Sequence, residues 1–168
     1  IGCANELFDL IYADGRIKSI LLVSPPGCGK TTALRDLVRI TSEKTKKNIL
    51  MIDEKCELYS DGFNVGDTTD VIQCCDKKFG LFIAVKNLSP EVVATDELTA
   101  LSDAEGVLFA GKSGVCVFAT VHGSSVSDIV CKEYLKPAIK EKCFDYLVSI
   151  EKNKDKLSLN EIIRGSEV

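Results

Sequence analysis

The chain has 168 residues, a length typical of one globular domain. Hydrophobic residues make up 45% of it, charged residues 27%, and the formal net charge is −4. This acidic balance argues against a nucleic-acid-binding groove, because contacts with backbone phosphates leave a basic surface, so no nucleic-acid partner is expected. No apolar run approaches the ~20 residues that cross a bilayer, and no signal peptide is visible.

The spacing of apolar residues predicts helices and strands that alternate along the chain. In order, we expect a lead-in helix within residues 1–15, a strand at 20–23, a helix after 31, a strand at 48–53, a loop at 54–69, a helix at 70–79, an ambiguous segment at 80–85, a strand at 91–97, a helix at 98–112, a strand at 114–123, a helix at 125–132 and a hairpin between 144 and 159. Such alternation favours an α/β fold with a mostly parallel sheet and helices on both faces.

Residues 24–31 read Ser-Pro-Pro-Gly-Cys-Gly-Lys-Thr and nearly match the phosphate loop G-x-x-x-x-G-K-[ST]. Its glycines let backbone N–H groups face phosphates, and the helix that follows adds its positive end. Lys30 is expected to reach the β- and γ-phosphates, and the Thr31 hydroxyl to hold Mg²⁺. Ser24 departs from the pattern, because a glycine is usual there. A purely structural Gly/Pro turn is the alternative, but strand, loop, Lys-Thr and helix in this order favour an ATP and Mg²⁺ site. The expected nucleotide-binding residues are Pro26, Gly27, Cys28, Gly29, Lys30, Thr31 and Thr32.

Two pairs of carboxylates follow predicted strands, at the edge where parallel sheets bind ligands. Asp96 is expected to hold Mg²⁺ near Thr31, and Glu97 to orient and deprotonate the water that attacks the γ-phosphate. Asp53-Glu54 forms the second pair, and two roles are open for it: binding a metal-bound water or beginning the loop. Glu54 is therefore a second catalytic candidate.

His122 is the one histidine of the chain and ends another predicted strand. A lone histidine near a core is more often structural, yet here its side chain would face the γ-phosphate, with Thr120 two residues earlier on the same face. We therefore count it with the catalytic candidates. The eight cysteines form no C-x-x-C pair, which favours reduced thiols over a zinc site.

Five segments carry a family resemblance: "LLVSPPGCGKTTALRDLVR", "IDEKCE", "TTDVIQCCDKKFG", "LSPEVVATDEL" and "ATVHGSS". They closely resemble the stage III sporulation AA family, which belongs to the secretion ATPase superfamily with the type II and type IV secretion and pilus motors. The resemblance implies a RecA-like P-loop ATPase core with a Walker A loop at 24–31, an Asp box at 53–54, a Walker B motif at 96–97 and a His box at 122–123.

The resemblance also implies a biological setting. The chain would be one ATPase domain, 1–168, made of a lead-in helix (1–15), a nucleotide-binding core (16–143) and a C-terminal hairpin (144–168). An N-terminal domain of the full-length protein would be absent, consistent with Ile1 in place of an initiator methionine. The full-length form would be a homo-oligomer, as a hexamer, in the mother-cell cytoplasm of a spore-forming bacterium. It would be held at the membrane by proteins of a sporulation channel complex, on which it acts as an ATP-hydrolysing motor.

The chain departs from the family pattern where arginines are usual. Two of these positions hold lysine, Lys55 and Lys86, and two hold uncharged residues, Thr68 and Ala100. Lysine lacks the planar fork that grips phosphate oxygens in pairs, so the isolated chain is expected to hydrolyse ATP weakly. The alternative function is a nucleotide-dependent assembly scaffold of the same membrane complex with little hydrolysis. A RecA-like motor on nucleic acid is disfavoured by the acidic charge.

Overall fold

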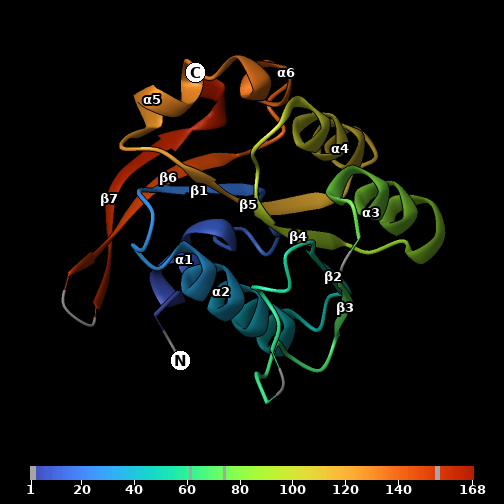
Figure 1. Ribbon diagram of the computed structural model, residues 1–168. Coiled ribbons are helices and arrows are strands. Elements are labelled where there is room, and N and C mark those ends of the chain that lie inside the picture. The colour runs from blue at the N-terminus through green and yellow to red at the C-terminus, as the bar shows by residue number, and fades with distance from the viewer. Residues whose placement is uncertain (1–2, 61, 74, 154–155) are drawn as a thin grey trace.

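The computed structural model describes residues 3–60, 62–73, 75–153 and 156–168. Within these residues seven strands form one sheet in the order β3-β2-β4-β5-β1-β6-β7 (Figure 1). All neighbouring strands pair in parallel except β6 and β7, which form an antiparallel hairpin. The strands are β1 Ile20–Ser24, β2 Ile49–Asp53, β3 Thr69–Gln73, β4 Val92–Glu97, β5 Cys116–His122, β6 Tyr146–Asn153 and β7 Lys156–Arg164. The predicted parallel sheet and C-terminal hairpin are confirmed.

Helices cover both faces of the sheet (Figure 1), as predicted. One face packs against α1 (Asn5–Ile11) and α2 (Lys30–Thr45), and the other against α3 (Lys77–Ile83), α4 (Leu101–Lys112), α5 (Val126–Val130) and α6 (Lys136–Lys140). Short helical turns lie at Ala84–Leu88, Glu133–Leu135 and Gly165–Glu167. The central strands are buried on both faces, which explains why their sequences are nearly continuous apolar runs.

The helix predicted at 70–79 is wrong in its first half. Residues Thr69–Gln73 form the edge strand β3, which pairs in parallel with β2. Three β-branched residues in this run, Thr69, Val71 and Ile72, suit a strand, and pairing with the neighbouring strand β2 overrides the helical pattern. The helix begins only at Lys77. Asp76 is its N-cap, and the Asp76 carboxylate accepts a hydrogen bond from the Phe79 N–H at 2.9 Å. The ambiguous segment 80–85 is helical and runs into the turn at Ala84–Leu88.

The strand order brings three predicted motifs to one edge of the sheet. β5 lies between β1 and β4, and the register pairs Ser24 with His122 and Glu97 with Thr120. The pairing of β4 with β5 shifts between Ala94 and Glu97. The phosphate loop, the Asp96-Glu97 pair and His122 therefore meet where these strands end.

Candidate functional site

The phosphate loop turns sharply between β1 and α2. Gly27 and Gly29 have φ angles of 75° and 86°, a region that glycine adopts without steric cost, and Gly29 is the N-cap of α2. Ser24, by contrast, is the last residue of β1 and lies fully buried in the extended backbone opposite His122. A strand residue needs no positive φ, which explains why serine is accommodated where the motif has glycine.

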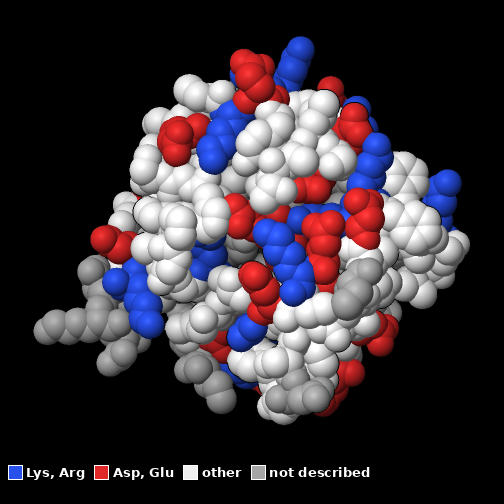
Figure 2. All heavy atoms as spheres, in the orientation of Figure 1, with Lys and Arg blue, Asp and Glu red and all other residues white. Residues whose placement is uncertain are grey.

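A cleft of about 400 Å³ opens in front of this loop. Its walls come from the loop, the start of α2, the segment after β2 and the ends of β4 and β5. The lining residues are Pro26, Gly27, Gly29, Lys30, Thr31, Thr32, Lys55, Glu57, Leu58, Asp96, Glu97, Thr120 and His122. Most predicted site residues thus share one cleft, on a molecular face where acidic and basic side chains are interspersed (Figure 2).

Cys28 and Glu54 are the two predicted site residues that do not line the cleft. The Cys28 thiol lies 3.8 Å from the carbonyl oxygen of Pro26. Glu57 and Leu58 line the cleft but were not predicted, because they lie in a loop without periodicity. Hydrogen bonds from their backbone N–H groups to Asp53, described below, hold them there.

The Lys30 side chain is folded onto the loop that carries it. It is 6% exposed, and its Nζ donates to the carbonyl oxygens of Ser24 (2.6 Å) and Pro25 (3.0 Å). Burial lowers the pKa of Lys30, while the nearby Glu97 carboxylate opposes that shift. The ammonium therefore lies at the N-terminus of α2 with few charged partners, and a bound phosphate would supply the missing negative charge.

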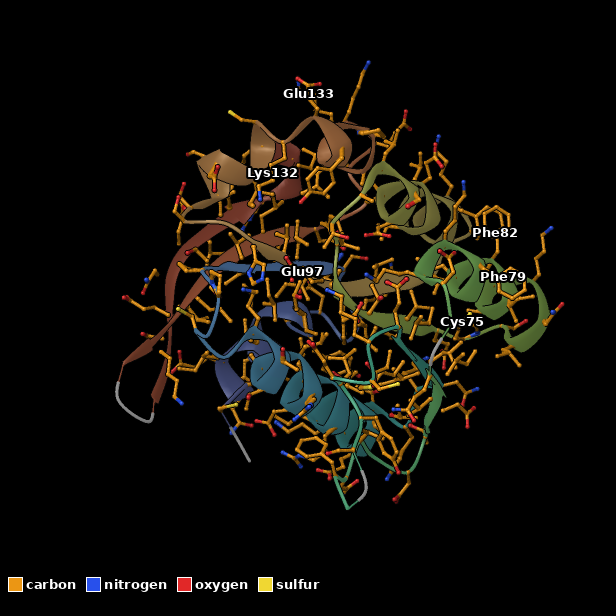
Figure 3. All side chains as sticks on the ribbon, in the orientation of Figure 1. Cys75, Phe79, Phe82, Glu97, Lys132 and Glu133 are labelled. Atoms are coloured by element: carbon orange, nitrogen blue, oxygen red, sulfur yellow. The ribbon has the colours of Figure 1, made fainter. Side chains whose placement is uncertain are left out.

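His122 connects Lys30 to Glu97. Its Nδ1 lies 2.7 Å from Lys30 Nζ, and its Nε2 lies 2.8 Å from Glu97 Oε2. Because an ammonium only donates, Nδ1 accepts, which assigns the ring proton to Nε2 and lets it donate to Glu97. Figure 3 shows Glu97 near the centre of the molecule, whereas Phe79 and Phe82 lie at the outer edge of α3. The structure thus joins the three predicted side chains, and their catalytic roles stay predictions.

Asp96 is held by a residue that sequence reasoning missed. Asp96 is 6% exposed, and its carboxylate lies 2.8 Å from the Nζ of Lys77, which is 1% exposed. Asp103 (3.7 Å) and Glu54 (3.4 Å) complete a group of three carboxylates around this one ammonium. Burial alone would lower the pKa of Lys77, but the hydrogen bond and the charge of Asp96 raise it, so Lys77 is charged.

The cleft fits a magnesium nucleotide by the chemistry of its donors. Asp96 Oδ2 is buried without a hydrogen-bond donor, and the Thr31 hydroxyl belongs to the same cleft. These are the hard oxygen ligands that Mg²⁺ prefers. Among the described residues, no group of three or more His, Cys, Asp or Glu side chains is arranged so that it could hold a metal ion.

Asp53 has the second of the two roles left open for it: it begins the loop. Its side chain is fully buried, and it accepts from the backbone N–H groups of Glu57 (2.8 Å), Leu58 (3.0 Å) and Tyr59 (2.9 Å). Burial opposes ionisation, but these hydrogen bonds, together with one from Gln73, leave the pKa of Asp53 below its usual value. Asp53 therefore shapes the loop that lines the cleft.

The positions where arginine was expected separate in space. Lys55 lines the cleft. Thr68 lies at the opposite edge of the sheet, where its hydroxyl donates to the carbonyl of Lys47 (2.7 Å) and contacts Ser42 Oγ (2.8 Å). Lys86 lies 5.4 Å from the Phe82 ring, and Ala100 precedes α4.

A helix long and apolar enough to cross a membrane is not found in the described part of the chain.

Solved structures of secretion motors share this fold. The pilus retraction motor PilT with bound ADP matches with a TM-score of 0.71 and 18% identity, over 95% of this chain and 50% of that one. The VirB11 ATPase of the Brucella suis type IV secretion system matches with a TM-score of 0.66 and 12% identity, over 96% and 50% of the two chains. The fold is therefore the RecA-like α/β fold of the secretion ATPases.

Sequence comparisons identify the family. Stage III sporulation protein AA of Bacillus subtilis (strain 168) is 32% identical over 96% of this chain and 55% of its own length. The protein SEEDLING PLASTID DEVELOPMENT 1 of Arabidopsis thaliana is 29% identical over 77% of this chain and 19% of its own. The chain thus spans about half the Bacillus protein and a smaller part of the plant protein. A family model described as "Sporulation stage III, protein AA" matches residues 1–166, and the chain belongs to this sporulation family.

Proposed function

We propose that this domain binds and hydrolyses ATP as the motor of a sporulation channel complex. The observation that carries the proposal is the cleft that unites the phosphate loop with Asp96, Glu97 and His122. Its volume of about 400 Å³ lies within the ~300–1,000 Å³ of small-molecule sites. Membership in the sporulation family and the fold shared with secretion ATPases support the same reading.

Each residue has a defined task in this proposal. The backbone N–H groups at Gly27 and Gly29 cradle the phosphates, and Lys30 turns from its carbonyl partners to bind phosphate oxygens. Thr31 and Asp96 would hold Mg²⁺, which neutralises charge on the phosphates when bound. Glu97 orients the attacking water and accepts its proton, and His122 fixes the direction of the Glu97 carboxylate through its Nε2–H.

Two substitutions test the proposal in the whole protein. Lys30→Ala removes the cation from the loop, so ATP affinity should fall steeply. Glu97→Gln keeps the shape but not the base, so ATP should still bind while kcat falls by ~10²–10⁴. Lys44→Ala is the control, because Lys44 lies in the last turn of α2, away from the cleft, and contacts the Phe8 ring. If Glu97→Gln hydrolyses ATP at the parent rate, Glu97 is not the base.

A nucleotide-dependent scaffold with little turnover is the second candidate, and Lys55 favours it. The side chain lines the cleft as a lysine, which cannot grip phosphate with two parallel hydrogen bonds as arginine does. Phosphate release at saturating Mg-ATP separates the two functions. We expect turnover that rises with protein concentration, because a neighbouring subunit supplies a cation. Tight ATP binding with no release at any concentration would favour the scaffold.

We further propose that the whole protein assembles as a hexamer in the mother-cell cytoplasm. There it would be peripheral to the membrane and bound to membrane proteins of the channel complex. Sedimentation with and without ATP tests the assembly. A protein that stays monomeric at all concentrations yet hydrolyses ATP briskly would contradict a site shared between subunits.

A further inference from the structure

Lys77 is a buried charge that the proposed ATP-binding cleft does not use directly. Fully buried lysines are rare unless they are paired. Its Nζ lies 2.8 Å from Asp96 Oδ1 and donates to the backbone carbonyl oxygen of Glu97 at 2.5 Å. One side chain from α3 therefore contacts both acidic residues at the end of β4, one through its carboxylate and the other through its backbone.

The end of β4 departs from a regular strand at this point. Residues Val92–Ala94 pair with Cys116–Phe118, and the next paired residue is Glu97, opposite Thr120. β4 therefore holds one residue more than β5 over this interval, which is a β-bulge. In a regular strand, Asp96 and Glu97 would point to opposite faces. Here both residues line the cleft.

We propose that Lys77 is a positioning residue that holds the β4 bulge and thereby aims Asp96 and Glu97 together into the cleft. Glu97 is the first paired residue after the bulge, and Lys77 donates to its carbonyl oxygen. The same ammonium holds Asp96 Oδ1 and leaves Oδ2 without a donor, as a magnesium ligand requires. This inference rests on the proposed ATP-hydrolysing function and adds a residue to its machinery.

A simpler role for Lys77 would be to balance buried charge. Asp103 and Glu54 lie within 4 Å of its Nζ, so the cluster holds more carboxylates than ammonium groups. The two roles differ in what restores activity. Removing a carboxylate together with Lys77 repairs a charge imbalance but leaves Asp96 and the Glu97 carbonyl without their donor.

The test measures ATP affinity with Mg²⁺ and with a chelator, and then kcat and KM, in the whole protein. Lys77→Met should leave the Mg²⁺-free affinity unchanged, because Lys77 does not line the cleft. It should reduce the gain in affinity from Mg²⁺, and kcat, by about 10- to 100-fold, the usual effect of losing a partner that orients a metal ligand. Lys78→Met is the matched control, since Lys78 is the next residue but is half exposed and pairs with Glu105.

Lys77→Met combined with Asp103→Asn separates positioning from charge balance. Asparagine still offers an oxygen to the N–H groups of Thr99 and Ala100, so α4 keeps its cap. The double variant should fold like the parent and keep the loss of kcat and of the Mg²⁺ effect. It carries the same prediction if Lys77→Met alone does not fold.

Three results would overturn the inference. Recovery of kcat in the double variant would show that Lys77 only balances charge. A Mg²⁺ effect and kcat equal to those of Lys78→Met would show that Lys77 has no role, while the proposed function stands. A parent protein without Mg²⁺-dependent ATP binding would contradict the proposed function and the inference together.

Discussion

Asp53→Asn tests whether a buried carboxylate shapes one wall of the cleft. In the parent, Oδ1 accepts from the N–H groups of Glu57 and Leu58, and Oδ2 accepts from Tyr59 N–H and Gln73 Nε2. Asparagine can replace only one of these oxygens, because its NH₂ group is a donor. The substitution therefore places the NH₂ group of asparagine against two of the N–H groups that donate to Asp53 in the parent.

The size of the effect follows from the bonds lost. Two hydrogen bonds to a charged acceptor are removed, and each is worth ~1.5–3 kcal/mol, but Gln73 keeps its bond to the Tyr59 carbonyl. We therefore expect the free energy of unfolding to fall by about 2–4 kcal/mol. For a chain of this size the melting temperature should fall by roughly 5–15 °C, which thermal unfolding followed by circular dichroism would measure. Asp70→Asn is the control, since Asp70 is exposed on β3.

The pH dependence gives a second check on Asp53. A carboxylate whose pKa is lowered on folding stabilises the native state fully above its unfolded pKa of about 3.9, and this contribution is lost as pH falls through the folded pKa. The gap between parent and Asp53→Asn should thus be constant near neutrality and shrink in acid. Equal stability at pH 7 would refute the assignment of Asp53 to the loop.

Three further predictions concern single residues. His122→Ala should lower kcat more than ATP affinity, because Glu97 loses the Nε2–H that orients it, and steady-state kinetics with a binding measurement would show this. Gly66→Ala should lower the free energy of unfolding by about 1–3 kcal/mol, because φ is +96° and the new Cβ would lie 2.3 Å from Ser42 Cβ. Gly111→Ala is the control, because Gly111 lies in α4 and a Cβ there meets only ordinary contacts; denaturant titrations should show its free energy of unfolding rising by up to about 1 kcal/mol. Burial raises the pKa of Cys143 to about 11, so alkylation at pH 8 followed by mass spectrometry should modify the exposed Cys56 and Cys131 first.

The sequence predicted the strands of the sheet centre because each is a short apolar run that ends in a turn. The phosphate loop was predictable for a local reason as well, because all the residues of its motif lie within eight consecutive positions. The edge strand β3 was not, because Thr69–Gln73 is only half buried and its pairing with β2 decides its structure. Local sequence patterns do not predict secondary structure where pairing with a strand distant along the chain determines it.

Lys77 was missed for the same kind of reason. In the sequence it is one of two adjacent lysines near the end of the helix predicted at 70–79, and nothing distinguishes it from Lys78. Its partners, Glu54, Asp96 and Asp103, come from three other segments and meet only when β2, β4 and α4 are packed. Burial separates the two lysines, since the side chain of Lys77 is 1% exposed and that of Lys78 is 42% exposed.

Two of the departures from the arginine pattern, Lys55 and Thr68, should behave differently when arginine is restored. Lys55 lines the cleft, so Lys55→Arg offers a planar fork to phosphate oxygens and should raise turnover. Thr68 bonds to Ser42 and Lys47 at the far edge of the sheet, so Thr68→Arg breaks these contacts and cannot reach its own cleft. It should therefore lower thermal stability without raising turnover measured at low protein concentration. An increase in turnover with Thr68→Arg that appears only at high concentration would instead place residue 68 at the cleft of a neighbouring subunit.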